Sequence, residues 1–208
     1  MPSMWSVNQP LSQRSRLGRV MLSPAGTGLL DVAILVGCGF TAAVMSALID
    51  LNLRLPGHAI LKVVLPLSLG MSLVPRQGAG VTMGASAGAT LWGMSLFGGS
   101  GVGPGAATSL LLLGPLLDLA VRRVGPGWRL YAAFGIAGLM ANLGAFVVRG
   151  GTKMSGGSLA GTRLLHDWLN IAPISYALCG LIAGFVSAAI FFGSGEAKQS
   201  HIEHEAEP

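Results

Sequence analysis

The segment VAILVGCGFTAAVMSALIDL, residues 32–51, decides the class of fold, because it is twenty residues long and its only charged side chain is that of Asp50. A helix of roughly 20 apolar residues crosses the hydrocarbon core of a bilayer. The whole chain of 208 residues is 51% hydrophobic and 10% charged, with a mean hydropathy of +0.65, whereas soluble domains carry about 25% charged residues. We therefore predict an all-α membrane protein, in which each helix satisfies its own backbone hydrogen bonds.

Outward from this segment, the apolar pattern recurs and predicts a polytopic bundle of about six transmembrane helices in one domain, residues 29–193. The second and fourth segments are short and contain proline and glycine, which predicts tilted or broken helices. A flexible N-terminal arm, 1–28, and a disordered polar tail, 194–208, are expected on either side. The six apolar segments are 32–51, 59–74, 78–97, 107–121, 130–148 and 171–192.

The formal net charge of +5 reflects membrane orientation rather than nucleic-acid binding, because the basic residues lie mainly at the ends of the apolar segments. Short connections rich in Lys and Arg stay in the cytoplasm, so both termini are expected to be cytoplasmic, in a bacterial inner membrane. Lipid is then the expected surroundings of the chain. The predicted cytoplasmic set is Arg14, Arg16, Arg19, Arg76, Arg122, Arg123, Arg129 and Lys198.

The connection DLNLRLPGHAILK, residues 50–62, gathers ionisable groups at the predicted outer surface. Pro56 removes a backbone donor and pushes the preceding residue away from helical geometry, so the chain should turn a corner there. One interpretation is a polar pocket for a small charged or metal-bearing solute, with His58 as a candidate metal ligand. The other is an interfacial ion pair between Asp50 and Arg54, with His58 capping the next helix. The candidate binding residues of this corner are Asp50, Asn52, Arg54, His58 and Lys62.

Two polar residues lie within later apolar segments. A buried amide must find hydrogen-bond partners, so Asn142 should either bridge helices, which we favour slightly, or reach a ligand. Asp118 precedes Arg122 by one helical turn, and a local ion pair explains it. After residue 158, Leu164, Leu165 and Trp168 recur at helical spacing, which predicts a short interfacial helix.

Catalysis is not expected. GASAG, residues 84–88, matches the G-x-S-x-G pattern, but that motif needs a strand-to-helix turn, and Ser86 lies in a segment of small residues with no histidine in a later apolar segment. Small residues of this kind indicate helix packing instead, as do Ala33 with Gly37 in the first segment and Gly135, Gly138 and Gly144 in the fifth. No enzyme activity and no cofactor are therefore predicted.

LRLPGHAIL, residues 53–61, and LFGGSGVGPGAATSLLLLGPLLD, residues 96–118, together with the stripe of Gly39, Ala43 and Ala47, resemble the S component of energy-coupling factor transporters, nearest the cobalt and nickel type. The resemblance implies capture of a vitamin or metal ion from outside. It also implies a transmembrane coupling subunit, met by the stripe, and two cytoplasmic ATPases. Metal-type members begin with Met-His and this chain begins MPSMWS, which leaves the solute open. The alternative is a structural subunit of a larger membrane complex.

Overall fold

The computed structural model describes residues 28–49, 57–98, 102–124, 127–155 and 162–193, and within them all regular structure is helical. The predicted fold class is confirmed as far as a bundle of six helices. These are α2 (Leu29–Leu48), α3 (Ala59–Leu73), α4 (Ala79–Leu96), α5 (Pro104–Arg123), α6 (Trp128–Ser155) and α7 (Thr162–Phe192).

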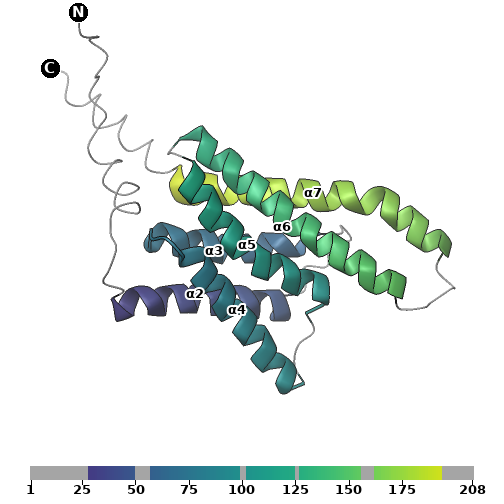
Figure 1. The fold of residues 1–208 in the computed structure, drawn as a ribbon, viewed down its shortest axis with the longest axis horizontal. Coiled ribbons are helices and arrows are strands. Elements are labelled where there is room, and N and C mark those ends of the chain that lie inside the picture. The colour runs from purple at the N-terminus through teal and green to yellow at the C-terminus, as the bar shows by residue number, and fades with distance from the viewer. Residues whose placement is uncertain (1–27, 50–56, 99–101, 125–126, 156–161, 194–208) are drawn as a thin grey trace, which may run out of the picture.

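Successive helices run in alternating directions, so the bundle has two distinct ends (Figure 1). The end that carries Gly57 and His58 is called the elbow end, and the opposite end, with Arg76, Arg122 and Arg129, is called the arginine end. Helix α3 lies in the middle, where it contacts α2, α4, α5, α6 and α7. Its 15 residues confirm the predicted short segment, and a helix this short suits a buried position.

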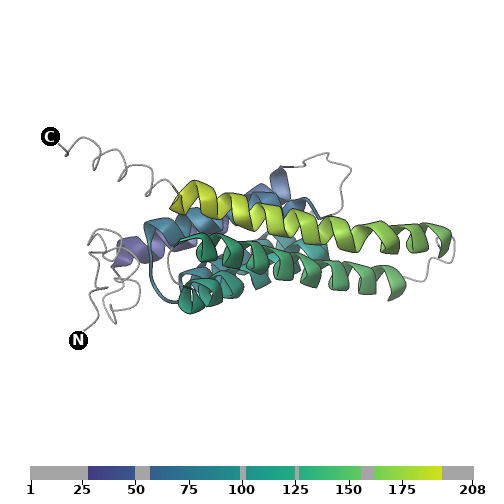
Figure 2. The same cartoon turned by 90° about the horizontal axis from the view of Figure 1, so that it is seen from above.

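Helices α6 and α7 form a long antiparallel pair (Figure 2), and glycines on both helices make its closest contacts. Gly184 lies against the Phe134 carbonyl, and Gly138 and Gly180 lie against each other's carbonyls, so a Cβ atom at these glycines would meet backbone. Small residues allow this approach, which substitutes for the hydrophobic effect between helices in lipid. The packing role predicted for Gly138 is therefore confirmed.

Two further close crossings hold α4. Gly39 of α2 faces the Met83 carbonyl, and Gly80 of α4 faces Gly114 of α5. Glycines at these two crossings therefore allow α2 and α5 to pack closely against α4. Gly37, expected to pack as well, faces outward instead, and a Cβ atom added there would meet no other atom within 4 Å.

Four helices are long and apolar enough to cross a membrane: α2, α5, α6 within Trp128–Thr152, and α7 within Asn170–Phe192. The chain is thus an integral membrane protein of the helical type. The fourth predicted segment is longer than expected, because α5 begins at Pro104 and has 20 residues. Proline fits the first helical turn, where its missing N–H costs nothing.

The prediction of a separate interfacial helix near residue 164 is wrong, because α7 begins at Thr162 and continues to Phe192 despite Pro173. With 28 and 31 residues, α6 and α7 are about 42 and 46 Å long, longer than the hydrocarbon core of about 30 Å. Arg129 and Arg149, both exposed on α6, are about 30 Å apart along its axis. The two guanidinium groups therefore match the two surfaces of a bilayer.

Candidate functional site

The elbow after Pro56 is fixed by the backbone of Gly57. Its φ of +89° lies in the left-handed region, which glycine adopts without steric cost. A Cβ atom there would lie 2.9 Å from Tyr176 Cα and 3.0 Å from Asn142 Nδ2. Position 57 therefore requires glycine for two reasons: the turn needs a positive φ, and α6 and α7 approach the backbone of the elbow too closely for a Cβ atom.

Asn142 joins the elbow to both long helices. Its Nδ2 donates to the Gly57 carbonyl at 3.0 Å and to the Tyr176 carbonyl at 2.8 Å, and the side chain is 1% exposed. The bridging role favoured from the sequence is confirmed, and the bridge reaches the elbow as well as a neighbouring helix.

The Asn142 carboxamide keeps one unused group. Both hydrogen bonds come from Nδ2, and Oδ1 accepts none from the described residues. An acceptor of this kind suits a hydroxyl, amino or amide group of a solute, or a water molecule.

Lys62 and His58 flank the elbow on α3. The Lys62 ammonium group donates to the Ile49 carbonyl, the C-cap of α2, although the side chain is only 7% exposed. A cation at a helix C-terminus is favoured by the helix dipole. His58 is the N-cap residue of α3, but its imidazole makes no capping hydrogen bond.

Tyr176 and Arg149 are two further polar residues of the elbow end, and the sequence analysis did not single them out. Arg149 Nη1 donates to the Tyr176 hydroxyl at 3.3 Å, and the Tyr176 ring packs against Phe146 at a centroid distance of 5.7 Å. Tyr176 is one of only two tyrosines in the chain, which was the available signal. Its register opposite Asn142 could not be read without the packing of α6 on α7.

The other predicted residues divide into two groups. Asp50, Asn52 and Arg54 lie outside the described residues, as do the N-terminal arm and the C-terminal tail. Asp118 is described and has a different role from the predicted ion pair. Its carboxylate oxygens accept from the backbone N–H groups of Gly80 at 3.0 Å and Val81 at 2.8 Å, so it caps the N-terminus of α4 from α5.

The stripe predicted to meet a coupling subunit lies largely inside the chain. Gly39 and Ala43 are buried, and Gly39 contacts the Met83 backbone, while Ala47 is half-buried. In this structure α4 covers Gly39, and the contact of this stripe with a coupling subunit stays a prediction.

No group of three histidine, cysteine, aspartate or glutamate side chains comes together among the described residues. The polar groups described around the elbow are the Asn142 carboxamide, the Tyr176 hydroxyl, the His58 imidazole and the cations of Lys62 and Arg149, a set that suits an organic molecule. Comparison of the chain with known protein families, curated proteins and solved structures gave no match.

Proposed function

We propose that all six helices cross the inner membrane of a bacterium, with both termini and the arginine end in the cytoplasm. Basic residues favour the cytoplasmic side of short connections. Arg76, Arg122, Arg123 and Arg129 lie at or beside the short α3–α4 and α5–α6 connections. Helices α2 and α7 begin and end, respectively, at this same end (Figure 1).

We further propose that the chain is the substrate-capture subunit of an uptake transporter of the energy-coupling factor type. The observation that carries this proposal is the pair of hydrogen bonds made by the buried Asn142 carboxamide. Its Nδ2 links the elbow and α7 to α6, and its Oδ1 is left as an acceptor for a bound solute. Polar groups at membrane depth are costly and mark functional sites by default. ATP hydrolysis is then supplied by cytoplasmic ATPases through a coupling subunit.

The solute proposed is a small organic molecule of the vitamin class that has a hydrogen-bond donor. Its donor would meet Asn142 Oδ1, and an acidic group on it would complement Lys62 and Arg149, two cations of this end whose hydrogen bonds are described. A bare metal ion fits less well, because these cationic groups repel it. His58 stays the candidate ligand if the solute carries a metal.

A ligand-dependent thermal-shift screen tests the proposal. The purified full-length chain in mild detergent is heated with each of a panel of vitamins and with divalent metal salts. We expect one organic solute to raise the melting temperature of the wild type and to lose that effect in Asn142→Leu. Ser86→Ala, which removes a single bond from α4 to the Val36 carbonyl, serves as the control and should keep the shift.

A panel without any stabilising solute would count against capture. The second candidate function is a structural subunit of a larger membrane complex, and the end of α4 favours it. Trp92, Leu96 and Phe97 are strongly exposed, Phe97 to 92%, where α4 projects beyond α2 (Figure 1). Co-purification with a stable complex that lacks ATPases would support this second function.

A further inference from the structure

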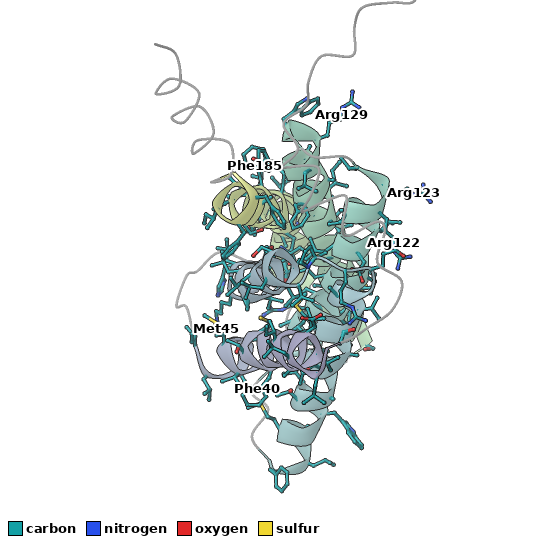
Figure 3. The ribbon with its side chains drawn as sticks, turned by 90° about the vertical axis from the view of Figure 1, so that its left-hand side faces the viewer. Phe40, Met45, Arg122, Arg123, Arg129 and Phe185 are labelled. Atoms are coloured by element: carbon teal, nitrogen blue, oxygen red, sulfur yellow. The ribbon has the colours of Figure 1, made fainter. Side chains whose placement is uncertain are left out.

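The arginine end carries a set of guanidinium groups with no described counterion. Arg122 and Arg123 end α5, and Arg129 lies in the first turn of α6, one short connection away. All three are exposed. Figure 3 shows them projecting outward from the α5–α6 side of the bundle, away from Phe40 and Met45 on α2.

The carboxylate nearest in sequence is already occupied. Asp118 lies one turn before Arg122, but both of its oxygens accept backbone hydrogen bonds from the start of α4. The other described carboxylate at this end is Asp31, in the first turn of α2, and Figure 1 shows α2 and α6 on opposite sides of the bundle. Within the described part of the chain, the three guanidinium groups are therefore not neutralised.

The neighbouring residues indicate that these groups lie at the height of lipid headgroups. Trp128, the first residue of α6 and the neighbour of Arg129, is 73% exposed. Exposed tryptophan is enriched at membrane–water interfaces. The separation of about 30 Å between Arg129 and Arg149 also assigns Arg129 to one bilayer surface.

We propose that Arg122, Arg123 and Arg129 form a binding site for the phosphate groups of an anionic phospholipid. Guanidinium groups bind phosphate oxygens in a bidentate manner. Each basic residue near an anionic surface strengthens binding about fivefold. The position beside Trp128 commits the site to a lipid rather than to a soluble phosphate, because acyl chains can lie against the apolar helices below. This inference does not depend on solute capture.

Lipid titration of the full-length protein in mild non-ionic detergent tests the site. Cardiolipin, phosphatidylglycerol and phosphatidylcholine are added separately, and bound lipid is counted by native mass spectrometry alongside the melting temperature. The test variant is Arg122→Gln/Arg123→Gln/Arg129→Gln. The matched control is Arg76→Gln, which removes one positive charge from the α3–α4 connection at the same end.

We expect cardiolipin and phosphatidylglycerol to bind and to stabilise the wild type, and phosphatidylcholine to do neither. The triple variant should bind cardiolipin at least about tenfold more weakly, with Arg76→Gln close to wild type. Raising the salt concentration of the wild type should weaken binding similarly, so the test stays decisive if the triple variant misfolds. Equal binding by the triple variant or by phosphatidylcholine would overturn the proposal. An equal effect of millimolar inorganic phosphate would show an adventitious ion only, and would overturn it too.

Discussion

Replacing Gly180 by alanine should separate α6 from α7, and the size of the effect follows from the crossing itself. The added Cβ atom would lie 2.5 Å from the Gly138 carbonyl oxygen, 2.8 Å from its carbonyl carbon and 2.8 Å from Leu139 Cα. Nonbonded carbon atoms prefer separations of about 3.5–4.0 Å. All three neighbours are backbone, so no side chain can rotate away, and the helices must move apart by about 1 Å.

The energetic cost of this movement can be bounded. Overpacking a well-packed contact costs about 1–3 kcal/mol, and the better helix propensity of alanine returns at most about 1 kcal/mol. Gly37→Ala is the matched control, because it is the same change at a helical position where the added Cβ atom has no neighbour within 4 Å. Gly180→Ala should therefore be less stable than Gly37→Ala by about 2 kcal/mol.

The assay is equilibrium unfolding in mixed micelles, with increasing sodium dodecyl sulfate and the helical circular dichroism signal as the readout. Gly180→Ala should unfold at a lower detergent fraction than the wild type, and Gly37→Ala at the same or a higher fraction. The Asn142–Tyr176 bond lies one turn from this crossing, so solute-induced stabilisation should weaken as well. If Gly180→Ala were as stable as Gly37→Ala, the inferred close crossing would be refuted.

Three further outcomes are expected. Asp118→Asn should cost about 1–2 kcal/mol and accelerate amide hydrogen exchange at Gly80, since it weakens the cap of α4; unchanged exchange would contradict the capping role. Asn142→Leu should cost about 1–3 kcal/mol by removing two buried hydrogen bonds that tie the elbow and α7 to α6, clearly more than Ser86→Ala in the same unfolding assay. In a background without Cys38 and Cys179, a cysteine at Thr152 should react with a membrane-impermeant maleimide on intact cells and a cysteine at Trp128 should not. Equal labelling of both positions would exclude the proposed orientation.

The helices were predictable because apolar composition and length are properties of each segment alone. Their ends were less predictable. The glycine-rich pattern around Pro104 predicts a turn, yet proline is compatible with the first turn of α5, which begins there. Polar residues and Pro173 interrupt the apolar pattern between 162 and 173 and so predict a break, whereas packing along α6 keeps α7 continuous.

The candidate site was predictable only in its parts. Asn142, His58 and Lys62 are conspicuous as polar residues in or beside apolar segments, and the structure places all three near the elbow. The partners of Asn142 and Lys62 are backbone carbonyls of Gly57, Tyr176 and Ile49, which carry no signal in side-chain patterns. The ion pair predicted for Asp118 was wrong for the same reason. The Asp118 carboxylate accepts hydrogen bonds from backbone N–H groups of α4, and these donors leave no trace in the side-chain pattern around Arg122.

The placement of Arg129 and Arg149 on a single straight helix has a consequence for where the chain can reside. Because α6 cannot lengthen, a bilayer much thicker than about 30 Å would pull one of these cations into hydrocarbon. Mismatch of this kind costs only fractions of a kcal/mol per Å, yet it sorts proteins among membranes. The spacing of the two arginines therefore makes the stability of the chain in a membrane depend on hydrophobic thickness, and thick, sterol-rich bilayers should exclude it.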